Sequence, residues 1–590
     1  MEVLYKPPRY TYLHSKTKSM KTSLPNLPLL LLCSYFSCFL LLVPAVSAKV
    51  FLSIDCGSSS LKPRTDNNTI EWVGDGPYIQ TGEIHKVNVP AVIPGFDSDA
   101  LNTLRAFPTR KKNCYSIDID DKEEDDNTTT VERVLVRASF YYGNYDNKSI
   151  PPKFNLQFNG NNWGQMETAN DSVVYSEMVF SLNKSSNIDV CLSQTQPNNI
   201  PFISALEVRS LDSDAYSYVP SEYPLFFHLR AAYGANKNIR YPEDSFDRIW
   251  SWIGPLESTS PLMRVRSNSP SIDVDNIEDE PPEKIFRTAL LRLNSSEDIF
   301  YSDTTDFTVP LNFNAYFSEV VKLNSTQKRS FDIVVNNNLD NSIILPKNPV
   351  IPPYGRALEV HILNVTAINS TVTLDFARTN GSTLPSLLNA LEAFTIGEKL
   401  AQGTNSNDVK ALGLLQKNFS QLQDWSGDPC LPSPYTWDWV TCNNDTDSPR
   451  ITGLYLNDHG LTGILPDFSA MNALETINLR NNSLMKEIPG FLGTFPKLTA
   501  LNLADNNFSG TIPSSLLNND NLKLETSGNP NLCTNTSTIC NTEKQVPSPR
   551  TGSSDTSPSI IPSRNNGKSF KVSGRPVLIL LIVFFSLYLL

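Results

Sequence analysis

The chain has 590 residues, of which 61 are acidic and 49 are basic, so its net charge is −12. This length exceeds what one hydrophobic core usually holds, so several domains are expected. The acidic balance argues against nucleic acid or an anionic lipid surface as a partner.

The first predicted element is a secretory signal peptide over residues 1–48. Three lysines precede an apolar run over 29–43, and Val46–Ala48 supplies small residues at a cleavage position. Met20 is a possible true start of this long leader. A transmembrane helix is the alternative, but the run is short. Cleavage would leave a mature chain that begins at Lys49, with a net charge of −16 because the leader holds five basic residues and one acidic residue.

Sequons and cysteines of the mature chain fit an extracellular protein. Fifteen Asn-X-Ser/Thr sequons lie between Asn67 and Asn535, which predicts a heavily glycosylated surface. Most cysteines should pair in an oxidising compartment. Two close pairs flank one segment, and three other cysteines share the N-terminal region, so one of these three is left over. The close pairs are Cys430 with Cys442 and Cys533 with Cys540, and the other three are Cys56, Cys114 and Cys191.

Residues 49 to about 400 have the pattern of β-strands. Short alternating runs such as "VERVLVRASFYY" are separated by turns rich in Asn, Pro and Asp. The region also looks duplicated, because the triplet Ala-Leu-Glu recurs at Ala205 and Ala390, one domain length apart. We therefore predict two tandem all-β sandwiches, half 1 over 49–215 and half 2 over 222–400.

A different architecture is predicted over 449–530. "LETINLRNNSLMKEIP" and "LTALNLADNNFSGTIP" share one frame, with leucines and prolines that recur every 23 or 24 residues. This period predicts a short leucine-rich-repeat solenoid. Asn482 and Asn506 should hydrogen-bond backbone groups between coils, and His459 takes the Asn position in the first copy.

Both ends of such a solenoid need a cap, because terminal coils expose their core. The segment 401–448 is predicted as the junction and N-terminal cap. There, Cys430 and Cys442 would close a loop, and three tryptophans would cover the first coil. Cys533 and Cys540 would close a C-terminal cap over 531–545. The tryptophans are Trp425, Trp437 and Trp439.

The C-terminal region predicts a disordered stalk over 546–576 and an apolar anchor signal over 577–590. As a helix, this tail would span about 21 Å of a hydrocarbon core that is roughly 30 Å thick. Small residues and a spacer precede it, so a GPI anchor is favoured over a short single-pass helix. The attachment residue is left open.

Several motifs resemble a known plant family. "RASFYYGNYDN", "PPKFNLQFNGNNW", "RYPEDSFDRIW" and "STLPSLLNALEAFTI" are similar to the plant malectin-like domain. "WSGDPCLPSPYTWDWVTC" followed by repeats resembles the ectodomains of malectin-like, leucine-rich-repeat receptor kinases, including symbiosis receptor-like kinases. Residues Gly427–Cys430 match the junction motif of those receptors. Those receptors continue into a kinase, whereas this chain is more similar to kinase-less, di-glucose-binding-like relatives.

Sequence signals for catalysis are scarce. The four histidines outside the leader lie far apart, and no metal-ligand spacing, nucleophile elbow, phosphate-binding loop or kinase motif is present. We therefore expect no enzyme activity, no cofactor and no metal site. A carboxylate pair for glycoside hydrolysis stays open, because sequence does not show its geometry.

Sugar binding is implied by the resemblance, since animal malectin binds a glucose disaccharide with strand aromatics. Tyr141, Tyr142 and Tyr145 match by motif, and Tyr316 and Phe317 are the expected equivalents in half 2. The alternative is that these rings belong to the sandwich core, as strand aromatics usually do.

The repeats suggest a second binding surface on the outward side of their strands. The function that we expect is cell-surface recognition, as a co-receptor, ligand-presenting partner or decoy beside a receptor kinase ectodomain. Its ligand would be a cell-wall saccharide or a peptide, and its location the outer face of the plasma membrane. Carbohydrate binding without signalling is the alternative, and a wall-active enzyme is a weaker one. The outward repeat residues are Tyr455, Asn457, Thr476, Asn478, Thr499 and Asn502.

Overall fold

The computed structural model describes most of the chain from Val50 to Cys533. The described residues are 50–60, 62–89, 93, 95–118, 133–182, 187–212, 214–254, 262–292, 299–304, 309–335 and 343–533. The predicted signal peptide, stalk and anchor signal, as well as Cys540, lie outside these ranges. Within them, no helix has the length and apolarity needed to cross a membrane.

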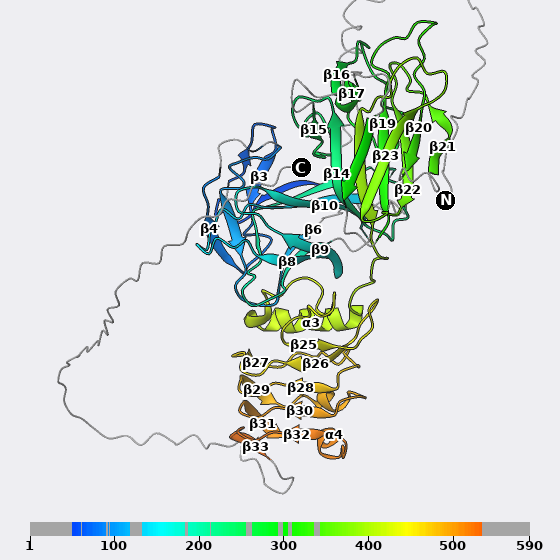
Figure 1. The fold of residues 1–590 in the computed structure, drawn as a ribbon. Helices are drawn as coiled ribbons and strands as arrows, with labels where there is room; N and C mark the ends of the chain where they lie inside the picture. Colours follow the sequence, from blue (N-terminus) through cyan, green and yellow to red (C-terminus); the bar gives the residue numbers. More distant parts are fainter. Residues whose placement is uncertain are drawn as a thin grey trace, which may run out of the picture. The chain divides into compact units, whose positions relative to one another are not determined.

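One 11-stranded sheet runs through both halves of the β-region (Figure 1). Its order is β2-β3-β1-β13-β7-β10-β14-β24-β19-β22, and β15 pairs with β14. The strands of half 1 are β1 (Phe51–Asp55), β2 (Arg64–Thr65), β3 (Glu71–Gly74), β7 (Arg133–Phe140), β10 (Val174–Ser181) and β13 (Ala205–Leu211). Those of half 2 are β14 (Leu225–Tyr233), β15 (Ser251–Ile253), β19 (Leu311–Phe317), β22 (Leu358–Val365) and β24 (Ala390–Ile396).

The link between the halves is the antiparallel pairing of β10 with β14, in which Met178 lies opposite Phe226. Such long-range pairing leaves no local signal in the sequence, so two separate halves were expected. The described halves instead share one sheet, while each keeps its own hydrophobic cluster.

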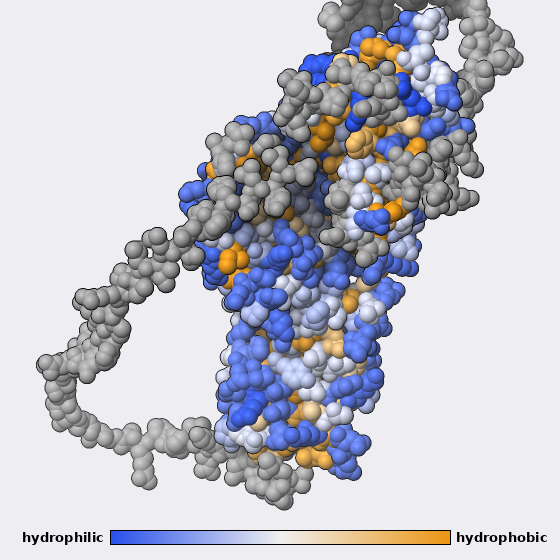
Figure 2. Space-filling model, in the orientation of Figure 1, coloured by the Kyte–Doolittle hydropathy of each residue, from blue (hydrophilic) through white to orange (hydrophobic). Residues whose placement is uncertain are grey.

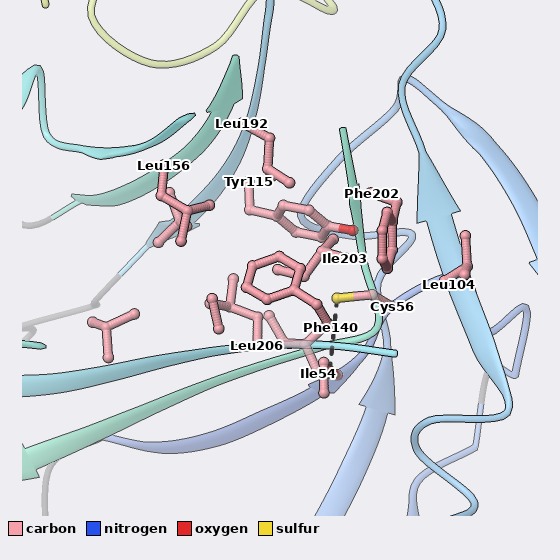
Figure 3. Packing of buried hydrophobic residues seen from close by; sticks show 14 of the residues in the cluster. Ile54, Cys56, Leu104, Tyr115, Phe140, Leu156, Leu192, Phe202, Ile203 and Leu206 are labelled. Atoms are coloured by element: carbon pink, nitrogen blue, oxygen red, sulfur yellow. Dashed lines mark hydrogen bonds between the residues drawn. The ribbon is translucent and has the colours of Figure 1, made fainter. Parts of the chain in front are cut away.

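Half 1 has a second sheet of order β6-β11-β8-β9, and side chains from both sheets form one core (Figure 3). Cys114 and Cys191 lie opposite each other on β6 and β11 and form a disulfide. Cys56 is therefore the cysteine left over, buried among apolar side chains. The remaining strands of half 1 are β4 (Glu83–Lys86), β5 (Thr103–Ala106), β6 (Lys112–Asp118), β8 (Lys153–Phe158), β9 (Asn161–Glu167), β11 (Asn187–Gln194) and β12 (Phe202–Ile203).

Half 2 packs the shared sheet against a sheet of order β18-β23-β20-β21. The two-stranded antiparallel sheet β16–β17 and the short helix α2, which lies between these strands in the chain, complete it. The elements are β16 (Leu262–Arg266), α2 (Glu283–Phe286), β17 (Thr288–Arg292), β18 (Ile299–Thr304), β20 (Phe331–Val335), β21 (Ile343–Val350) and β23 (Thr371–Arg378).

The repeats form a solenoid-like arrangement of parallel strands, to which β25 of the cap adds an antiparallel partner of β26. One sheet has the order β25-β26-β28-β30-β32 and the other β27-β29-β31-β33. Its elements are β25 (Val440–Cys442), β26 (Ile451–Tyr455), β27 (Thr462–Gly463), β28 (Thr476–Asn478), β29 (Ser483–Glu487), η3 (Gly490–Gly493), β30 (Ala500–Asn502), β31 (Asn507–Thr511), α4 (Ser514–Leu517), β32 (Lys523–Glu525) and β33 (Asn531–Cys533).

The predicted asparagine ladder is confirmed. The Asn482 side chain donates to the carbonyl oxygens of Leu456 and Leu479, which lie on successive coils, at 2.8 and 2.9 Å. Asn506 repeats this contact one coil later. Asn529 does so again, which reveals a fourth coil with a weaker leucine pattern. Each amide satisfies buried backbone groups that a coil cannot pair by itself.

The N-terminal cap contains the expected Cys430–Cys442 disulfide. Trp437 and Trp439 are buried in the repeat core, and Trp425 packs against it, so the tryptophans cover the first coil as predicted. A helix that the pattern did not predict, α3 (Ser406–Asn418), and the short η2 (Ser420–Leu422) complete the cap. Cys533 is disulfide-bonded, and its expected partner Cys540 lies outside the described residues.

Candidate functional site

Tyr141 and Tyr142, the best candidates for sugar stacking, lie in the core of half 1. Tyr141 is only 4% exposed, and Tyr142 is 0% exposed. The Tyr142 ring lies 6.1 Å from Phe202 and 5.6 Å from Tyr145, and its hydroxyl donates to Asp146. Tyr145 is half-buried against His85, with its hydroxyl also buried. The two tyrosines therefore have no open ring face for a sugar in this structure.

The candidates of half 2 are buried as well. Tyr316 and Phe317 are both 0% exposed. Their expected equivalence to Tyr141 and Tyr142 is wrong by two residues. Tyr316 lies opposite Ala390, and the corresponding Ala205 lies opposite Ser139. In the register of the two Ala-Leu-Glu strands, Phe317 therefore matches Phe140, which is also a core residue.

We predict that Tyr142→Ala destabilises half 1 by about 3–5 kcal/mol, because it leaves a cavity in a close-packed core. Chemical unfolding of the secreted ectodomain measures this effect. Tyr142→Phe is the matched control, since it keeps the ring and removes only the hydroxyl contact to Asp146. Unchanged stability of the alanine variant, together with lost glycan binding, would instead identify Tyr142 as a ligand contact.

The outward repeat residues form two rows across β26, β28, β30 and β32. Tyr455, Asn478, Asn502 and Glu525 lie in one row of aligned residues. Tyr455 is 39% exposed and is the most accessible aromatic there. Asn457 follows β26, and its side chain accepts a hydrogen bond from Asn478 at 3.2 Å. The second row consists of Gly453, Thr476, Ala500 and Lys523. We call these two rows the strand face.

Thr499 does not belong to the strand face. It precedes β30, and its hydroxyl donates to the Glu475 carbonyl oxygen at 3.1 Å. Ala500 takes its place in the row. Lys523 and Glu525, on the fourth coil, were missed because the coil itself was not recognised.

One face of the repeats in Figure 2 is largely hydrophilic.

The segment Asp424–Tyr435, here called the junction loop, contacts the outer face of the second sheet of half 1. Lys112 donates from its buried ammonium to the carbonyl oxygens of Asp428 and Leu431, at 2.6 and 2.9 Å. Burial lowers the pKa of Lys112 to about 8. At one edge, the Arg110 guanidinium lies 4.2 Å from the Trp425 ring centroid. Half 1 and the repeat cap are thus joined by polar contacts, of which the hydrogen bond from Lys112 to Leu431 is buried.

Within the junction loop, the Asp428 carboxylate accepts hydrogen bonds from the backbone of Thr404, Cys430 and Leu431, at 2.7 to 2.9 Å. Gly427 lies against the Cys114–Cys191 disulfide with φ +73°. A β-carbon at this position would come within 2.4 Å of the Cys114 sulfur. These contacts explain why the turn requires glycine and then aspartate.

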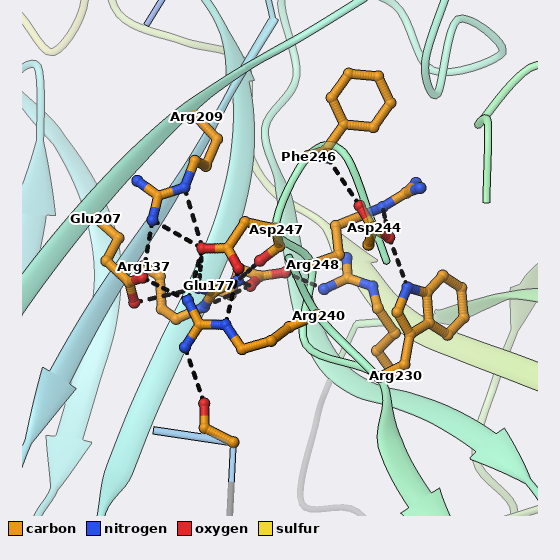
Figure 4. Close-up of polar contacts among 12 residues, drawn as sticks. Arg137, Glu177, Glu207, Arg209, Arg230, Arg240, Asp244, Phe246, Asp247 and Arg248 are labelled. Carbon is orange, nitrogen blue, oxygen red and sulfur yellow. Dashed lines mark hydrogen bonds and ion pairs between the residues drawn. The ribbon is translucent and has the colours of Figure 1, made fainter. Parts of the chain in front are cut away.

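A buried ion network lies where the two halves meet (Figure 4). The Asp247 carboxylate accepts from Arg209 and Arg240 at 2.7 and 2.6 Å. Burial by itself raises the pKa of Asp247. The neighbouring guanidinium groups of Arg240 and Arg209 outweigh burial and hold this pKa well below its usual range. Five arginines and five carboxylates gather here, four of each in one connected set of ion pairs and the fifth of each in the separate pair Arg248–Asp244. They are Arg137, Arg209, Arg230, Arg240, Arg248, Glu177, Glu207, Asp244, Asp247 and Glu392.

Glu207 and Glu392 of this network end the two Ala-Leu-Glu triplets. The repeated triplet signalled duplication in the sequence, but it gave no sign that its glutamates are buried at the meeting of the halves. Among the residues that the structure describes, no group of three His, Cys, Asp or Glu side chains could hold a metal ion.

Comparison with known proteins agrees with this architecture. A model of the malectin-like domain matches residues 54–396. A probable leucine-rich-repeat receptor-like serine/threonine-protein kinase of Arabidopsis thaliana is 32% identical over 451 residues, which cover 74% of this chain and 49% of the relative. A putative leucine-rich-repeat receptor-like protein kinase from the same plant is 33% identical over 448 residues, covering 74% and 48%. The chain thus spans about half the length of these relatives.

Among solved structures, the ANX2 ectodomain from Arabidopsis thaliana is similar with a TM-score of 0.47 and 17% identity. The match covers 59% of this chain and 97% of that one.

Proposed function

Because the chain belongs to the malectin-like domain family, and the relatives that it matches over 74% of its length are receptor-like kinases, we propose that it is a cell-surface recognition protein. It binds the extracellular domain of a receptor kinase through the strand face. A co-receptor, a ligand-presenting and a decoy role all fit this contact. The observation that carries the proposal is the accessible polar and aromatic surface of the strand face.

The sequons support this choice of surface. All eleven sequon asparagines among the described residues are exposed, and none lies in β25, β26, β28, β30 or β32. Oligosaccharides at these positions would therefore not be attached to the strands of the strand face; the nearest site, Asn481, follows Asn478 by three residues and donates to Asp458. The eleven are Asn67, Asn147, Asn170, Asn324, Asn364, Asn369, Asn380, Asn418, Asn444, Asn481 and Asn507.

Carbohydrate binding without a signalling role is the alternative function. It has no support from Tyr141, Tyr142, Tyr316 or Phe317, whose rings are buried. Exposure on the outer side of the plasma membrane, with a lipid tether directed by the predicted anchor signal 577–590, is part of the proposal. Those residues lie outside the described ranges, so the tether stays a prediction.

A glycan placed on the strand face tests the proposal. Arg480→Thr creates an Asn-Leu-Thr sequon at Asn478, in the middle of one row. Proximity labelling on plant cells with the tagged protein should then lose most of the labelling of receptor kinase ectodomains, because a glycan blocks the surface. A mass shift of the purified protein shows whether the new sequon is occupied.

The matched control is Arg480→Ala. It removes the same exposed ion pair with Asp505, which contributes little stability, but adds no sequon. Labelling should stay at the wild-type level. If the occupied Arg480→Thr variant labels the same ectodomains as the wild type, the strand face is not the contact.

A further inference from the structure

Strand β22 (Leu358–Val365) forms one edge of the 11-stranded sheet. It pairs with β19 on one side, and no described strand pairs with its other side. From Leu358 to Ile362, the pairing with β19 is regular over five consecutive residues. The outward backbone N–H and C=O groups of such an edge are a template on which a strand of another molecule can add.

Two other edges of the β-region are protected by the strand itself. At the opposite edge of the same sheet, β2 has only two residues. At one edge of the second sheet of half 2, β21 includes Pro346 and Pro349, which have no N–H group to offer a further strand. By contrast, β22 is eight residues long and contains neither proline nor lysine. Its edge therefore needs another kind of protection.

A bulge near the end of β22 places a glycosylation sequon at this edge. Leu363 and Asn364 together lie opposite the single residue Asn312 of β19. Asn364 has a φ of +60°, and its backbone N–H donates to Asn312 Oδ1 at 2.9 Å. Asn364 is exposed and begins the sequon Asn-Val-Thr. An oligosaccharide at this position would stand directly beside the regular part of the edge.

A second sequon lies close by but outside the strand. Asn369 is exposed in the tight turn that follows β22, where Ile368 and Thr371 exchange backbone hydrogen bonds of 2.9 and 3.0 Å. Asn369 and Ser370 both have positive φ, as a two-residue turn of this kind requires. Of these two sequons, only that of Asn364 begins within the edge strand.

We propose that an oligosaccharide on Asn364 shields this sheet edge and keeps β22 from pairing with β22 of a second copy of the chain. Two identical strands that pair antiparallel are self-complementary, so a second copy is a ready partner for a bare edge. In such a pair, Asn364 of one copy lies beside the start of β22 in the other. A bulky group there blocks the approach of the two backbones.

The modification follows the usual chemistry of secreted proteins. The Asn364 side-chain nitrogen loses one proton and bonds to the anomeric carbon of the oligosaccharide, while the bond from that carbon to a lipid diphosphate breaks. The lipid diphosphate is the leaving group, and the amide keeps its second hydrogen. The shielding role therefore depends on the predicted secretion of the chain, and it is independent of the strand face.

Asn364→Gly tests the proposal, because glycine accepts the positive φ and keeps the N–H contact with Asn312. Size-exclusion chromatography with light scattering gives the mass of the secreted protein over a range of concentrations. The wild type should stay monomeric, whereas the mass of the variant should roughly double or rise further at high concentration. Hydrogen exchange in β22 should then slow, since new hydrogen bonds protect its outward amides.

Asn369→Gly is the matched control. It also removes an exposed sequon at a positive φ, five residues further along the chain, but it leaves the glycan within the edge strand in place. This variant should stay monomeric. Trimming the glycans of the folded wild type with an endoglycosidase repeats the test without a substitution, and the association that follows should again slow hydrogen exchange in β22.

Several results would overturn the proposal. Peptide mass spectrometry that finds Asn364 unmodified in the secreted wild type is one of them. Another is an Asn364→Gly variant that stays monomeric, since the bulge alone would then protect the edge. Association of Asn369→Gly to the same extent, or association of any form without slower exchange in β22, would place the contact elsewhere on the molecule.

Discussion

Asp247→Asn should destabilise the β-region by about 3–5 kcal/mol, an effect as large as the one expected for Tyr142→Ala. The change removes the negative charge that Arg209 and Arg240 share, at 2.7 and 2.6 Å. Both guanidinium groups would stay buried, each with only Glu207 as an anionic partner. The midpoint of thermal or denaturant unfolding of the secreted protein measures this loss.

A control for charge alone is Asp505→Asn, which breaks the exposed ion pair with Arg480 in the repeats. That change should alter stability by less than about 1 kcal/mol, because water screens exposed pairs. If Asp247→Asn were equally mild, the ion network would be dispensable for joining the halves, and the apolar contacts of β10 with β14 would have to suffice.

Gly427→Ala should destabilise the junction loop by about 2 kcal/mol or more, through a strained positive φ and a steric clash. The added methyl group would lie 2.4 Å from the Cys114 sulfur and 2.9 Å from that of Cys191. The loop would have to move away from half 1 and weaken the contacts of Lys112. Faster hydrogen exchange in both the loop and β6 would report this movement, as would lower secretion.

Gly413→Ala offers a matched control with the opposite expected sign. Gly413 lies inside α3, and a β-carbon there would meet no atom within 4 Å. Alanine in a helix is favoured over glycine by about 0.5–1 kcal/mol, so this variant should be slightly more stable. If both variants behaved alike, the close contact of Gly427 with the disulfide would not govern the junction.

The repeats show how far a local pattern reaches. Their leucines, the ladder positions Asn482 and Asn506, and the Cys430–Cys442 disulfide could all be predicted, because each depends on a spacing of two dozen residues or fewer. The fourth coil was missed because its leucine pattern is weaker, although Asn529 keeps the spacing. Thr499 was misplaced by one residue, since the pattern does not show where β30 begins.

The candidate sugar site shows the opposite case. Tyr141, Tyr142, Tyr316 and Phe317 lie in or beside strands, and a strand pattern tells only that alternate residues share a face. Which face is covered depends on the sheet that packs against it. In this fold, both halves bury these rings, and the register of β13 and β24 sets their true correspondence.

By itself, then, the sequence determined the β-rich region, the duplication, the repeat period and the capping disulfide, because these follow from composition and short spacings. Only the tertiary structure decided which segments that are distant in the sequence contact each other. Lys112 meets Asp428 from more than three hundred positions away, Tyr216 meets Asp279, and β10 pairs with β14 across the two halves. Contacts between distant residues depend on how whole sheets pack, and such packing leaves no periodic trace in a single chain.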